Sequence, residues 1–91
     1  MTNAKRSPKV VLVDYEEKMS LVQAAEFLET VAKKLREEGE FTLTQGKYEH
    51  IVKPASTVEL EVKLEKRGDK HELEVELEWY DGDKDIKLSV K

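Results

Sequence analysis

The sequence contains no cysteine, few aromatic residues and no long apolar run. None of its 91 residues is cysteine, and 7% are aromatic. Without cysteine there is no disulfide, thiol nucleophile or cysteine metal site, which fits a reducing cytosol. No run approaches the roughly 18 apolar residues of a membrane helix, and residues 1–9 lack the apolar stretch of a signal peptide. We therefore expect a cytoplasmic protein with no membrane partner.

Charged residues are abundant instead, at 40% of the chain, and the net charge is -4. The acidic excess lies in residues 54–91, which carry 11 acidic and 7 basic side chains. Basic residues outside the predicted helix cluster only at Lys5, Arg6 and Lys9, so we expect no nucleic-acid binding. The length allows one domain. We assign residues 1–8 to a flexible basic tail and residues 9–91 to a single domain.

The first half of that domain predicts a strand, a helix and a hairpin. The β-branched apolar run at residues 10–13 is typical of a buried central strand. Ser20 and Gln23 have the spacing of a capping box, which predicts a helix from Leu21 that ends at Gly39. Alternation across residues 41–52, with a turn at Gln45 and Gly46, predicts a hairpin that pairs Leu43 with Tyr48 and Phe41 with His50.

Residues 58–79 alternate between apolar residues and glutamate or lysine, which predicts two half-buried antiparallel strands joined by a turn at residues 66–71. A turn near Asp81 and Gly82 then leads to a last strand at residues 86–90, whose register sets Trp79 against Ile86. The predicted fold class is α+β. One amphipathic helix packs on one face of a largely antiparallel five- to six-stranded sheet in the order β-α-β-β-β-β, with an extra C-terminal strand as an option.

Residues 72–79 form a strongly amphipathic strand that closes on Trp79 and follows a helix rich in alanine, leucine and glutamate. This pattern resembles the amphi-Trp domain, from Val10 to Trp79. The resemblance implies a widespread prokaryotic domain of uncharacterised function, with no catalytic or cofactor residues to transfer. Residues 83–91 lie beyond that tryptophan.

The candidate interaction surface is the charged face of the predicted meander together with the aromatic pair that follows it. Its residues are Glu59, Glu61, Glu72, Glu74, Glu76, Glu78, Trp79 and Tyr80. Like charges on neighbouring strands destabilise a sheet, so such a face could be retained to bind a basic partner. The simpler interpretation is a solvated face whose charges block edge-to-edge aggregation. Trp79 suits either a small core or an interface, and Tyr80 is freer to make contacts.

No catalytic, cofactor or metal residues emerge from the chain. Two histidines, His50 and His71, lack zinc-site spacing, and the Asp81, Asp83 and Asp85 series departs from a calcium loop at Ile86. We therefore expect no cofactor and no enzymatic activity. The sequence favours a binding or assembly module that acts through a sheet face or edge, as a homodimer or with a protein partner. The alternative is an acidic regulator whose glutamate face binds a basic protein.

Overall fold

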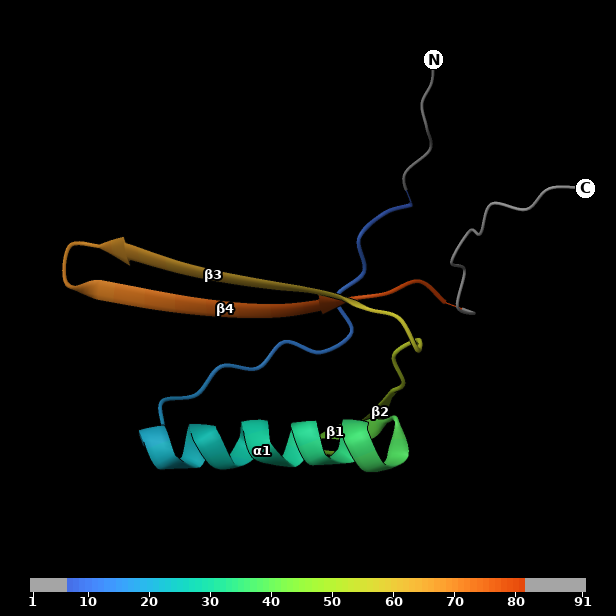
Figure 1. Cartoon of the computed structure of the whole chain (residues 1–91). Coiled ribbons are helices and arrows are strands. Elements are labelled where there is room, and N and C mark those ends of the chain that lie inside the picture. The colour runs from blue at the N-terminus through green and yellow to red at the C-terminus, as the bar shows by residue number, and fades with distance from the viewer. Residues whose placement is uncertain (1–6, 82–91) are drawn as a thin grey trace, which may run out of the picture. The chain divides into compact units, whose positions relative to one another are not determined.

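A computed structural model describes residues 7–81 of the chain. The elements are α1 (Leu21–Glu38), β1 (Phe41–Gln45), β2 (Tyr48–Val52), β3 (Glu59–Arg67) and β4 (Lys70–Glu78) (Figure 1). The α+β class is confirmed. The strands form two separate two-stranded sheets, so the predicted single sheet of five or six strands is not confirmed. Two compact units, Met1–Ile51 and Val52–Lys91, divide the chain and are described in turn.

Helix α1 begins and ends as predicted because both of its ends are specified locally. The Ser20 hydroxyl accepts a hydrogen bond from the Gln23 N–H at 3.0 Å, and the Gln23 side chain accepts one from the Ser20 N–H at 3.0 Å. These two bonds complete the capping box. At the other end Gly39 has φ 73°, and its N–H donates to the carbonyls of Lys34 and Leu35. A left-handed residue here favours glycine, which explains where the helix stops.

The apolar stripe of α1 consists of Leu21, Ala24, Ala25, Leu28, Val31, Ala32 and Leu35, and its least exposed members are Ala24, Val31 and Leu35. The end of this helix packs against β1, where Phe41 and Leu43 are also half-buried. The remaining apolar positions of the stripe, including Leu21 and Leu28, are exposed. The stripe is therefore only partly covered.

The hairpin of β1 and β2 forms as predicted, but its turn lies one residue later. Strand β1 ends at Gln45 and β2 begins at Tyr48, so Gly46 and Lys47 form the connection. Gly46 has φ 62°, which suits the first central position of a two-residue hairpin turn. The strand bounds make Gln45 and Tyr48 the residues that flank the turn, so the predicted pairings of Leu43 with Tyr48 and of Phe41 with His50 are not confirmed. Leu43 and His50 are both half-buried.

Residues 10–13 form no strand, which corrects the prediction for this segment. A β-branched run favours extended backbone, but a strand also needs a neighbour for its N–H and C=O groups. Val10, Val11 and Leu12 are between 67% and 72% exposed. Local sequence preference without a pairing partner did not produce a strand here.

Strands β3 and β4 form a regular antiparallel hairpin in which every residue from Glu59 to Arg67 faces a partner from Glu78 to Lys70. The turn is Gly68 and Asp69, shorter than the predicted residues 66–71, and Gly68 has φ 59°. Before β3, the chain leaves β2 just ahead of Pro54, which cannot donate to a ladder. The predicted last strand at residues 86–90, its turn and the pairing of Trp79 with Ile86 lie outside the described residues.

In the part of the chain from residue 7 to residue 81, no helix combines the length and apolar character needed to cross a membrane.

Candidate functional site

The six glutamates predicted as an interaction surface lie on one face of the β3–β4 hairpin. Glu59 faces Glu78 and Glu61 faces Glu76, so two of the cross-strand pairs join like charges. Glu72 and Glu74 continue the same face of β4, because side chains two residues apart in a strand share a face. The structure therefore brings together six of the eight predicted site residues.

The register adds members of this face that the prediction of the site did not include. Glu65 faces Glu72 and forms a third pair of like charges, whereas Lys63 faces Glu74. The Lys63 Nζ lies 3.7 Å from Glu74 Oε1 and 3.6 Å from Glu65 Oε2. All three side chains remain at least 39% exposed, and exposed ion pairs contribute little stability. Lys63 therefore offsets only part of the negative charge.

Charge changes sign towards the turn. Positions 59–65 and 72–78 carry seven glutamates and one lysine, but the turn end carries Lys66, Arg67 and Lys70 beside Asp69. Arg67 faces Lys70, which is a further pair of like charges. Prediction missed this basic end because a six-residue turn would leave Arg67 and Lys70 unpaired. The glycine at position 68, read as the first residue of a two-residue turn, was the signal that could have revealed it.

Repulsion across the hairpin changes the acidity of Glu76. Its pKa is raised above the ordinary glutamate value, and the largest cause is the negative charge of Glu61 on the facing strand. Glu78 and Glu74 raise this pKa further from the same strand. The carboxylate face is thus an area of uncompensated negative potential, which attracts cations and basic groups.

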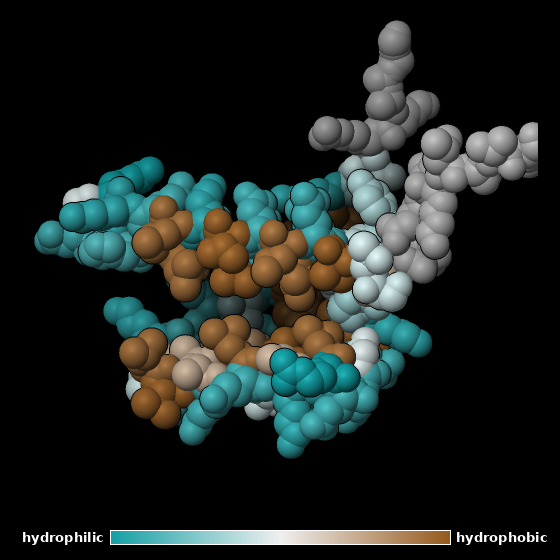
Figure 2. All heavy atoms as spheres, in the orientation of Figure 1, coloured by the Kyte–Doolittle hydropathy of each residue, from teal (hydrophilic) through white to brown (hydrophobic). Residues whose placement is uncertain are grey.

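The opposite face of the hairpin is apolar. Figure 2 shows its hydrophobic side chains gathered along one side of the two strands, with hydrophilic side chains along the other. The register matches apolar residues in three successive cross-strand pairs, Leu60 with Leu77, Val62 with Val75, and Leu64 with Leu73. These six side chains are between 38% and 71% exposed.

Trp79 and Tyr80 follow directly after β4 and belong to no strand. Trp79 is half-buried, whereas Tyr80 is 79% exposed. Both extend the candidate surface along the chain beyond Glu78. The alternation that runs through β4 ends before them, so the structure does not assign either ring to the carboxylate face.

An amphipathic hairpin of this kind, after a helix and followed by tryptophan, is the pattern on which the resemblance rested. Comparison with known families matches the amphi-Trp domain over residues 7–91. The chain belongs to the amphi-Trp domain family. The match continues past Trp79 to residue 91, so the family also covers residues 83–91, which we had placed beyond the resemblance. The comparisons with curated proteins and with solved structures returned no match.

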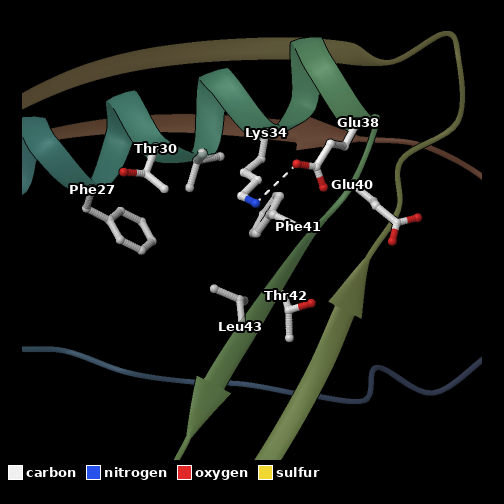
Figure 3. A pocket seen from close by; sticks show the side chains of 9 residues that line it. Phe27, Thr30, Lys34, Glu38, Glu40, Phe41, Thr42 and Leu43 are labelled. Atoms are coloured by element: carbon white, nitrogen blue, oxygen red, sulfur yellow. Dashed lines mark hydrogen bonds and ion pairs between the residues drawn. The ribbon is translucent and has the colours of Figure 1, made fainter.

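A second candidate site in this amphi-Trp domain is an open hollow of about 330 Å³ between the end of α1 and β1. Figure 3 shows Phe27, Thr30 and Lys34 along the helix, with Phe41 and Leu43 on the strand. Lys34 Nζ and Glu38 Oε2 form an ion pair at 3.2 Å, so these two charges are directed at each other. Tyr48 and His50 do not line this hollow.

Metal-binding groups do not converge in the described part of the amphi-Trp domain. Between residues 7 and 81, no three histidine or acidic side chains are placed so that they could hold an ion together. His50 lies on β2, and His71 lies on β4 opposite Lys66. The hairpin face therefore remains the leading candidate site.

Proposed function

We propose that the chain is a non-enzymatic binding or assembly module that acts through the β3–β4 hairpin. The observation that carries the proposal is the hairpin itself, with nine residues in each strand and two faces of opposite chemistry. An isolated two-stranded hairpin is marginally stable in water, and a sheet with an apolar face generally needs further strands or a packing partner. A surface that gains stability by association suits an assembly module.

The unpaired edges of this hairpin support the same proposal. Within residues 7–81, β3 and β4 pair only with each other, so each strand has one edge of unpaired backbone groups. Such an edge is a template for another strand, because its N–H and C=O groups are already in position. Assembly through an edge also extends the apolar face of the hairpin.

The test of this proposal is the molar mass of the full chain by light scattering, over a range of concentrations and at low and high salt. We expect an oligomer of defined size that persists at high salt, because backbone hydrogen bonds and apolar contacts are little affected by screening. A monomer under every condition would contradict the assembly function.

The glutamate face favours a second candidate function, an acidic regulator that binds a basic protein. Its support is the raised pKa of Glu76, which marks a face where repulsion is retained rather than neutralised. Such a face would bind a basic segment with an affinity that falls as salt rises.

Anisotropy of a labelled oligolysine peptide tests this second function. Reversing three charges together in Glu74→Lys, Glu76→Lys and Glu78→Lys should abolish binding at low salt. The matched control reverses three helical charges, in Glu26→Lys, Glu29→Lys and Glu37→Lys, and should retain most of it. If both variants lose peptide binding equally, binding depends only on net charge, and the regulator hypothesis is rejected.

A further inference from the structure

The edge of β3 that faces away from β4 is regular enough to accept another strand. Strand β3 runs from Glu59 to Arg67 without proline, and its register with β4 contains no bulge. Proline and bulges are two of the devices that prevent pairing at sheet edges. Charged side chains are another such device. The pattern of charges on β3 therefore decides which strand can pair with its edge.

Hairpin geometry determines which backbone groups of β3 point outward. A two-residue turn is closed by a hydrogen-bonded pair, here Arg67 with Lys70. Hydrogen-bonded and non-hydrogen-bonded pairs alternate along an antiparallel ladder. Odd-numbered residues of β3 therefore bond to β4, and even-numbered residues direct their N–H and C=O groups to the free edge.

A second copy of β3 can pair antiparallel with this edge only in registers that keep the two faces separate. A shift of one residue would move every leucine and valine to the charged side. Even-numbered residues must therefore face even-numbered residues, which leaves registers that differ by steps of two. The charged face then distinguishes among these registers.

One register gives every charged residue on the charged face within the overlap a partner of opposite charge, while Lys66, on the apolar face, lies opposite Val62. When Leu64 faces Leu64 of the second copy, Glu61 faces Arg67 and Lys63 faces Glu65. Two-fold symmetry repeats both pairs, so four pairs of opposite charge form. These are the non-hydrogen-bonded positions, where facing side chains approach most closely.

The neighbouring registers fail on charge. A shift of one step sets Lys63 against Lys63 and Glu61 against Glu65. A shift in the other direction sets Lys63 against Arg67 and Glu65 against Glu65. Strand β4 offers no equivalent, since any antiparallel overlap of three or more of its charged positions opposes glutamate to glutamate.

We propose that β3 pairs antiparallel with β3 of a second copy, centred on Leu64, to form a continuous four-stranded sheet. This inference rests on the proposed assembly function and names its partner as the chain itself. It gives both Lys63 and Arg67 a glutamate of the second copy as partner. The apolar faces of two hairpins join into one surface, and four strands exceed the size at which sheets become independently stable.

Charge reversal at two positions tests the register. In Glu61→Arg an arginine faces Arg67 of the second copy, and in Arg67→Glu a glutamate faces Glu61. Each change creates two repulsive pairs, so each should weaken dimerisation about tenfold or more in sedimentation equilibrium. The double variant restores opposite charges in all four pairs and should return to the affinity of the unmodified chain.

The same two substitutions, Glu61→Arg and Arg67→Glu, should stabilise the hairpin within one chain. Glu61 faces Glu76 and Arg67 faces Lys70, so either single reversal replaces repulsion by attraction inside the hairpin. Glu76→Arg is the matched control, because it relieves the same repulsion and changes net charge equally without touching the β3 edge. This control should leave dimerisation unchanged, which separates the interface from the stability of the hairpin.

Each outcome bears on a separate claim. Weakening by both single variants with recovery in the double variant supports the register. If neither single reversal changes the dimerisation affinity, the β3 pairing is overturned, and the chain assembles through another surface. A monomer at every concentration overturns both the pairing and the assembly function.

Discussion

Glu76 carries an electrostatic cost that follows directly from its position in the ladder. It faces Glu61 and lies between Glu74 and Glu78 on the same strand. Its pKa is raised chiefly by Glu61, so the ionised form is less favourable in the folded chain than in the unfolded chain. Ionisation of Glu76 therefore opposes folding, which is the reverse of the usual contribution of a paired carboxylate.

The pH dependence of Glu76→Gln should report this cost. Below the ordinary glutamate pKa of 4.5 both states are protonated, and variant and unmodified chain should have equal stability. As pH rises through the raised pKa, the folded state holds the proton longer than the unfolded state, so the unmodified chain loses stability. The variant should therefore be the more stable at pH 7, as measured by urea unfolding.

Glu49→Gln, on β2, is the control for the loss of one carboxylate, and added salt should shrink the difference made by Glu76→Gln. A Glu76→Gln variant that is less stable at pH 7 than at pH 4, relative to the unmodified chain, would refute the account of repulsion.

Alternation alone placed the glutamates of β3 and β4 on one face, because the period of two is a local property of extended backbone. The turn set at residues 66–71 encloses Arg67 and Lys70, so the opposition of these two residues could not be derived from it. The register of β3 with β4 depends on a single positive φ at Gly68.

Among the elements, α1 was predictable at both ends, and the strands were predictable mainly in their existence. The capping box and Gly39 act through bonds that span at most five residues, so the sequence contains the whole signal. The turn of the first hairpin was misplaced because both candidate turns include Gly46. The segment at residues 10–13 shows the limit of local preference, since pairing depends on distant residues.

Ser20→Ala tests the energetic role of the capping box. The change removes the acceptor of the Gln23 N–H and should reduce the free energy of unfolding by about 1 kcal/mol. Helicity by circular dichroism and thermal unfolding provide the measurement.

Thr30→Ala is the comparison within the same helix. The Thr30 hydroxyl donates to the Glu26 carbonyl. This bond lies in the helix interior and satisfies none of the free N–H groups at the start of the helix. Alanine is also the better helix former, so this variant should retain stability or gain a little. Equal losses in the two variants would mean that the capping box contributes nothing specific.

At the scale of the whole molecule, the family and the fold class could be predicted from the sequence pattern, but the grouping of strands into sheets could not. The amphi-Trp domain match and the α+β class both agree with the residues that predicted them. The single large sheet is not confirmed, because within residues 7–81 β2 and β3 belong to separate ladders, and strand order depends on contacts that no local pattern encodes. An assembled sheet of four strands, two from each copy, would restore part of that architecture between molecules.

Amide hydrogen exchange along β3, at low and high protein concentration, tests the central claim most directly. The account predicts that the outward N–H groups of Val62, Leu64 and Lys66 gain protection as concentration rises. The N–H groups of Glu61, Lys63 and Glu65, which already face β4, should change little. If the outward amides exchange freely at every concentration, or protection appears on β4 instead, the hairpin does not assemble through β3.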